Sequence, residues 1–197
     1  MTEAEWLACA DPVPMLDLVS GTAAGRKLRL FAAACSRRAW DRLDDLGRAA
    51  VEVAEQFADG RAGADALRAA RLACRGAGSA AAWYAAATRP AVAARNAALS
   101  ALAGPDPAAE RAAQTELLRC VLGNPFRPVA TNPAWLTPTV VSLAEGIYAD
   151  RAYDRLPVLA DALRDAGCED PDVVSHCRGP GSHVRGCWVV DLVLGRE

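Results

Sequence analysis

The sequence has few aromatic residues, only two histidines and a single lysine. Aromatic residues make up 6% of the 197 residues, although 52% of the chain is hydrophobic. Much of the hydrophobic fraction is alanine, which has the highest helix propensity, whereas β-branched residues are confined to short stretches. The composition therefore predicts an all-α fold without significant sheet.

The chain also lacks an excess of charge of either sign. It has 22 basic and 24 acidic residues, interspersed along the sequence, and a formal net charge of -2. No global field would attract nucleic acid or an anionic membrane, so neither is a predicted partner. All basic residues except Lys27 are arginines. Arginines form a binding site only where several guanidinium groups converge.

Export and membrane signals are missing too. Residues 1–6 are acidic and contain neither the positive nor the apolar region of a secretory signal. The longest uncharged apolar stretch, residues 80–87, is far shorter than the ~20 residues that cross a bilayer. Seven cysteines without regular pairing intervals predict reduced thiols, most of them small buried side chains. We expect a cytoplasmic protein without a membrane span.

Apolar residues at helical spacing, separated by glycine and proline, predict about nine helices in an irregular bundle. The alanine-rich tract 76–103 leaves its buried face undetermined, and the apolar segment 187–194 favours a helix over a short strand. The clearest interruption is Gly104-Pro105-Asp106-Pro107, where Asp106 can cap the following helix. We predict a single domain, residues 1–197, that could divide into two lobes, 1–104 and 105–197.

Basic residues line the polar side of the predicted helix that begins at Arg26. Three aspartates follow directly and can neutralise much of this charge. A solvated face is therefore favoured over a phosphate-binding surface. The basic residues are Arg26, Lys27, Arg29, Arg37, Arg38 and Arg42.

Several segments resemble a family of uncharacterised bacterial proteins. They are residues 6–9, the helix 26–40, the loop Asn124-Pro125-Phe126-Arg127-Pro128 and, most extensively, 154–195, with DRLPVLADAL, AGC and HCRGPGSHVRGCWVVDL. Residues 155–163, followed by Gly167, are also similar to a short helical repeat-companion motif of large bacterial multigene sets. The family has no established activity, so the resemblance implies one folded unit and no catalytic residues.

Both histidines and three of the cysteines lie in one short C-terminal segment. Zinc binds four Cys or His side chains in a tetrahedron, and the turn Gly179-Pro180-Gly181 could bring the two halves of this segment together. The candidate ligands are His176, Cys177, His183 and Cys187. Their spacing is atypical, because the adjacent His176 and Cys177 point about 100° apart on a helix. The alternative is a set of buried thiols with surface or capping histidines.

A cysteine and a histidine of this cluster could instead form a nucleophile and its base, with Asp191 orienting the imidazole. No protease motif surrounds Cys177 or Cys187, which favours small thiols that fill a helical corner. Asp191 itself lies in an apolar run, where an unpaired carboxylate would cost several kcal/mol. We predict a buried ion pair for it, with Arg155, Arg185 or Arg127 as the partner.

Trp135 and Arg127 belong to the proline-rich connection around residues 124–138. Tryptophans are more often packing anchors than ligand platforms, and Trp135 is the predicted exception. We expect both side chains at the surface of this loop.

The sequence contains no glycine-rich phosphate loop, dinucleotide fingerprint, paired-histidine metal helix or serine elbow. The favoured interpretation is a non-enzymatic helical module that binds another protein, as one member of a regulatory or defence set. The alternatives are a zinc-stabilised helical domain and a small thiol-dependent enzyme. The sequence does not determine the partner, a substrate or the oligomeric state.

Overall fold

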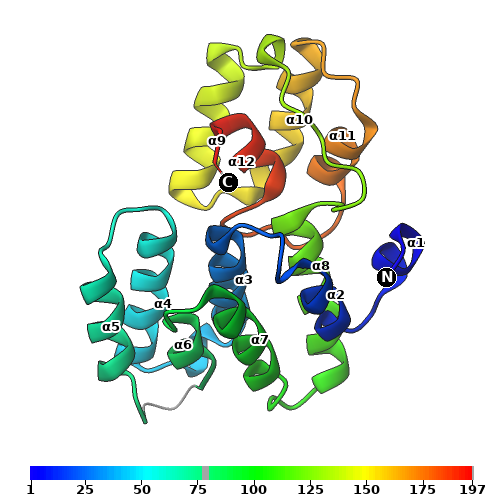
Figure 1. Ribbon diagram of the computed structural model, residues 1–197. Helices are drawn as coiled ribbons and strands as arrows, with labels where there is room; N and C mark the ends of the chain where they lie inside the picture. The colour runs from blue at the N-terminus through cyan, green and yellow to red at the C-terminus, as the bar shows by residue number, and fades with distance from the viewer. Residues whose placement is uncertain (77–79, 197) are drawn as a thin grey trace.

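The computed structural model describes residues 1–76 and 80–196. These residues form twelve α-helices and three short 3-10 helices and include no strand, which confirms the all-α prediction (Figure 1). The prediction of about nine helices was too low, because short linking segments form helices of their own. None of the described helices is long and apolar enough to cross a membrane.

The helices are α1 Glu3–Ala8, α2 Pro12–Val19, α3 Gly25–Arg37, α4 Asp45–Ala58, α5 Ala64–Ala73, α6 Ala80–Ala85, α7 Pro90–Ala101, α8 Pro107–Leu122, α9 Pro138–Asp150, α10 Leu156–Asp165, α11 Pro171–Arg178 and α12 Trp188–Leu194. The 3-10 helices are η1 Trp40–Arg42, η2 Pro133–Trp135 and η3 Tyr153–Arg155.

The helices are arranged in two lobes (Figure 1). Helices α1 to α8 form the first lobe, and α9 to α12 form the second. The predicted boundary at residue 104 differs from this division, because α8 packs on α2 and α3 of the first lobe. Leu117, Leu118 and Val121 of α8 belong to the apolar core of the first lobe. The chain therefore passes to the second lobe after α8, through the segment 123–137.

Helix α3 is the centre of the first lobe, where it contacts α4, α6, α7 and α8. The alanine-rich tract supplies α6 and α7, and α7 buries alanines on two sides, Ala93 and Ala97 against one core cluster and Ala94 and Ala98 against another. Small side chains let neighbouring helices approach closely. Residues 77–79 of this tract lie outside the described residues.

The basic residues of α3 do not form the solvated face predicted from the sequence. Arg29 is 1% exposed and donates hydrogen bonds to the backbone carbonyls of Ala85, Ala87 and Thr88 at the end of α6. These carbonyls have no partner within the helix, which explains why a buried guanidinium is favourable there. Arg37 pairs with Glu55 of α4 at 2.6 Å. The amphipathic pattern identified a polar face but not its buried partners.

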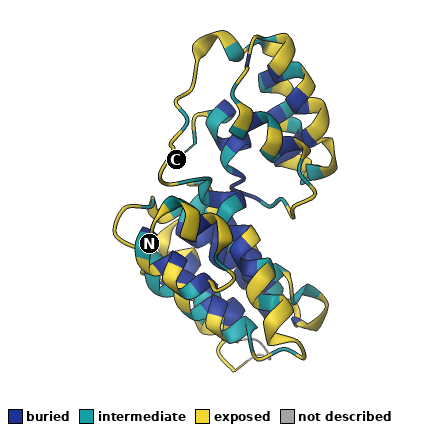
Figure 2. Ribbon diagram, turned by 90° about the vertical axis from the view of Figure 1, so that its right-hand side faces the viewer, coloured by how far each residue is buried: buried dark blue, intermediate teal, exposed yellow. Residues whose placement is uncertain are grey.

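The second lobe has its own apolar core, which α12 completes with Val189, Val190 and Val193. The segment 187–194 is thus helical, as predicted. Figure 2 shows buried residues inside both lobes and also where the chain runs between them. Three buried carboxylates lie at this junction, and each pairs with a cation from the other lobe: Glu55 with Arg151, Asp59 with Arg185, and Asp191 with Arg26.

Gly186 lies where the loop before α12 approaches α3 most closely. Its φ is +91°, and a Cβ atom there would lie 2.8 Å from Leu30 Cδ1 and 3.1 Å from Leu30 Cβ. Any side chain at this position would therefore be strained twice, by its backbone and by its neighbour. The adjacent Cys187 takes its position from this close approach.

We predict that Gly186→Ala lowers the free energy of unfolding by about 2–4 kcal/mol, the sum of the left-handed backbone and the overpacking against Leu30. Gly181→Ala is the matched control, because a Cβ atom at Gly181 meets nothing within 4 Å. Its effect should stay within about 1 kcal/mol. Urea denaturation followed by circular dichroism measures both, and equal effects of the two substitutions would contradict the close approach.

Candidate metal centre

Four side chains that can bind a metal ion converge where α8 meets the second lobe. They are Cys120, His176, His183 and Cys187, and their ligand atoms all lie within 4.8 Å of one another. His176 Nε2 is 3.3 Å from Cys187 Sγ, and Cys120 Sγ is 3.7 Å from His183 Nδ1. The ligands of a tetrahedral zinc ion lie about 3.3–3.8 Å apart, given Zn–N and Zn–S bonds of about 2.0–2.3 Å. Two ligand pairs therefore already have the spacing of a zinc site.

The four residues come from α8, from α11 and from the loop between α11 and α12. Cys120 lies on α8, His176 on α11, and Cys187 is the residue that precedes α12. His183 lies in the loop between α11 and α12, which a hydrogen bond from Cys187 N to Val184 O closes at 2.9 Å. Since α8 belongs to the first lobe and the other three residues to the second, the cluster joins the two lobes.

The four side chains that converge differ from the predicted ligand set in one residue. Cys177 faces the core of the second lobe, where it is buried together with Val173. Its neighbour His176 turns toward the cluster, as expected for adjacent residues that point about 100° apart on a helix. Cys120 takes the fourth position, but it comes from a distant part of the sequence. The only feature of Cys120 in the sequence was its place among apolar residues on a predicted helix.

Both thiols of the cluster are buried, Cys187 with 0% of its surface exposed. Burial alone would raise the pKa of Cys187, but hydrogen bonds with Cys120, His176 and His183 lower this pKa well below its ordinary value. The hydrogen bond to Cys187, together with burial, raises the pKa of Cys120. The two thiols thus shift each other's pKa in opposite directions, and a metal ion that binds both sulfurs would bind them deprotonated.

The two ring nitrogens of His183 differ in their surroundings. The Nδ1 atom lies 3.7 Å from Cys120 Sγ, whereas the Nε2 atom is buried and has no hydrogen-bond partner among the described residues. Leaving such an atom unsatisfied costs about 1–3 kcal/mol. Zinc accepts either imidazole nitrogen as a ligand. His183 would bind the ion through Nδ1, the nitrogen that lies next to Cys120 Sγ, so the unpartnered Nε2 is not itself evidence of a ligand.

The donor set matches zinc. Two sulfurs and two imidazole nitrogens are soft or borderline ligands, which select zinc over magnesium or calcium. Four protein ligands complete a tetrahedron and leave no position for water or substrate, which is the pattern of structural zinc sites. The rings of His176 and His183 meet edge to face, with centroids 4.8 Å apart.

Asp191 forms a buried ion pair, with partners other than those predicted. Its side chain is 1% exposed and lies 2.7 Å from Arg26 and 2.5 Å from Lys27, both at the start of α3. Sequence spacing pointed to arginines nearer in the chain, whereas the contact is made across the lobes. With two cations on its oxygens, Asp191 does not orient either histidine.

The two loop residues singled out in the sequence lie apart from each other. Trp135, in η2, is half-buried against the core of the second lobe. Arg127 is exposed and lies 3.5 Å from Asp172 of α11 and 3.9 Å from Glu3 of α1. Arg127 thus bridges the two lobes beside the metal cluster, whereas Trp135 is a packing residue.

No family model, curated protein or solved structure matches the chain. The resemblance to a bacterial family therefore stays a prediction, and function has to be argued from the geometry and chemistry of the site.

We predict that Cys120→Ser weakens zinc binding by about tenfold or more, because it removes one of four ligands. Cys177→Ser, a matched change of a buried thiol, should leave the affinity unchanged, since Cys177 lies outside the cluster. Competition with a chromophoric chelator measures both affinities. The reverse order, with Cys177→Ser the weaker binder, would restore the ligand set predicted from the sequence.

Proposed function

We propose that this chain is a helical scaffold stabilised by a structural zinc ion, which Cys120, His176, His183 and Cys187 bind. The observation that carries the proposal is the convergence of these four donors, from two lobes, to within 4.8 Å of one another. The ion would connect α8 to the loop before α12 and so hold the second lobe against the first.

The second lobe has a physical need for such a connection. Its helices α10, α11 and α12 have 10, 8 and 7 residues, and helices this short are marginal without tertiary contacts. Three buried ion pairs join this lobe to the first one, and the desolvation of their charges offsets much of their attraction. Structural zinc contributes about 10–16 kcal/mol of binding free energy in small metal-dependent folds. One ion could therefore decide whether the two lobes stay docked.

A zinc ion with four protein ligands has no open position and so performs no chemistry of its own. The scaffold would then act by binding, in agreement with the interaction module predicted from the sequence, and its predicted partner is another protein. A cytoplasmic location fits this proposal, because thiols stay reduced there.

Thiol catalysis is not proposed. A catalytic thiol has to be reachable and ionised. Burial raises the pKa of Cys177, and both Cys177 and Cys187 are buried. Cys187 lies inside the cluster, and Asp191, the predicted third member of a triad, is held by Arg26 and Lys27 instead.

We predict that protein purified without chelator contains about one zinc ion per chain, which elemental analysis measures. Removal of the ion should lower the melting temperature by about 8–16 °C, because about 4 kcal/mol of linked binding energy is lost at zinc concentrations near a thousand times Kd. Added zinc should restore the original value, and added magnesium should not, because magnesium prefers oxygen ligands.

The Cys177→Ser variant is the control for this experiment, because it keeps all four ligands and should respond to zinc as the unmodified chain does. A metal-free chain whose melting temperature stays the same with and without zinc would refute the structural role.

A further inference from the structure

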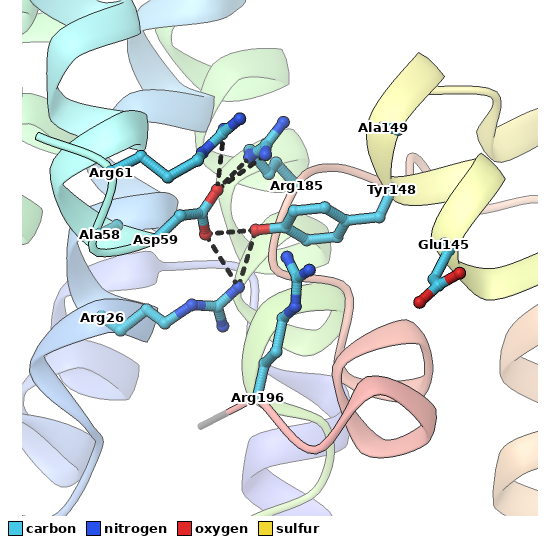
Figure 3. A pocket seen from close by; sticks show the side chains of 9 residues that line it. All are labelled: Arg26, Ala58, Asp59, Arg61, Glu145, Tyr148, Ala149, Arg185 and Arg196. Atoms are coloured by element: carbon cyan, nitrogen blue, oxygen red, sulfur yellow. Dashed lines mark hydrogen bonds and ion pairs between the residues drawn. The ribbon is translucent and has the colours of Figure 1, made fainter. Parts of the chain in front are cut away.

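A cavity of about 570 Å³ lies between the two lobes, away from the four metal-binding residues (Figure 3). Its lining comes from α3, from the end of α4, from α9 and from both sides of α12. Small-molecule sites usually have volumes of about 300–1,000 Å³. The cavity is thus large enough for a metabolite, and the two lobes together form its walls.

The lining of this cavity is rich in arginine. Four arginines and two carboxylates line it, so the described lining has an excess of two positive charges. The rest of the chain is slightly acidic, with a formal net charge of -2. The arginines are Arg26, Arg61, Arg185 and Arg196, and the acids are Asp59 and Glu145.

Three of the arginines share one carboxylate. Asp59 lies 3.2 Å from Arg26, 3.2 Å from Arg61 and 2.7 Å from Arg185. The hydroxyl of Tyr148 donates a further hydrogen bond to it at 2.5 Å. Burial alone would raise the pKa of Asp59, but Tyr148 and the arginines lower it below its ordinary value. Asp59 is therefore ionised at neutral pH. Arg26 also pairs with Asp191, so the single charge of Asp59 is left to balance Arg61 and Arg185.

The fourth arginine, Arg196, lies against an aromatic ring. None of the described residues places a carboxylate within 4.0 Å of the Arg196 guanidinium, which instead stacks on the Tyr148 ring at 4.1 Å. Arg185 stacks on the same ring at 4.2 Å. Figure 3 shows the ring between these two arginines, with Glu145 pointing away from Asp59. Tyr148 thus holds two guanidinium groups close together at the wall of the cavity.

We propose that this cavity binds the phosphate group of a small phosphorylated metabolite. A phosphate monoester concentrates a charge of about -1.5 to -2 on three oxygens, which matches the excess of two positive charges gathered around Tyr148. Guanidinium groups bind phosphate oxygens through paired hydrogen bonds, and Arg61 and Arg196 have donors to spare. The remaining volume would hold the organic part of the ligand.

Other anions fit less well. A dicarboxylate spreads its two charges over separate groups, whereas three of the arginines here meet at Asp59 and two stack on Tyr148, whose hydroxyl bonds to Asp59. A nucleic acid carries one charge per phosphate and needs a basic surface that follows its backbone. The cavity offers one concentrated site, which favours a small phosphate ester.

Isothermal titration calorimetry on the full chain, at constant ionic strength and neutral pH, tests the proposal with inorganic phosphate and phenyl phosphate as probes. Both should bind at a single site. Arg196→Gln and Arg61→Gln should each weaken binding by about tenfold or more, because each removes a charged donor. Arg68→Gln is the matched control, because Arg68 lies on α5, is 58% exposed and pairs with Asp65 of the same helix, away from the cavity, so the affinity should not change.

Near-ultraviolet circular dichroism shows whether each variant is folded. Two cavity variants are made, so that the proposal can be tested even if one of them does not fold. The proposal is overturned if Arg196→Gln and Arg68→Gln bind phosphate equally, or if succinate binds as tightly as phenyl phosphate. A single-stranded oligonucleotide that binds more tightly than phenyl phosphate would also overturn it. The four residues of the Cys/His cluster lie outside this cavity. Failure of the phosphate proposal would therefore leave the zinc proposal standing, and failure of the zinc proposal would leave the phosphate proposal standing.

Discussion

Buried charge at the junction of the two lobes is the constraint on which the rest of the structure depends. Each lobe has an apolar core of its own, and the carboxylates of Glu55, Asp59 and Asp191 lie between them. A buried carboxylate that loses its partner destabilises a protein by several kcal/mol. The lobes can therefore meet only in an arrangement that gives each of these acids its cations.

Helix α3 holds the two segments that carry the cysteines of the Cys/His cluster. Lys27 donates to the carbonyl oxygen of Gly186 at 3.0 Å and to Asp191 at 2.5 Å, which fixes the start of α12 on α3. Helix α8 packs on the same helix and presents Cys120. Because α3 holds both α8 and the start of α12, Cys187 comes close to Cys120, and their sulfur atoms lie within 4.8 Å of each other.

The sequence predicted the helical class and three of the four cluster residues, because both follow from local patterns. Cys120 could not be predicted, since only tertiary packing brings it near the C-terminal segment. The break at Gly104-Pro105 proved to be a turn between α7 and α8 of one lobe, because a turn signal does not tell which core the next helix joins. Likewise, the arginines of α3 gave the pattern of a polar helix face. This pattern is the same whether the face meets solvent or buried carboxylates of another element.

The proposed connection between the two lobes is one zinc ion that residues of both lobes coordinate. X-ray absorption spectroscopy of the zinc-loaded chain measures this coordination directly. We expect two sulfur ligands at about 2.3 Å and two nitrogen ligands at about 2.0–2.1 Å. A shell of only nitrogen and oxygen, or one with more than four ligands, would contradict the cluster of Cys120, His176, His183 and Cys187.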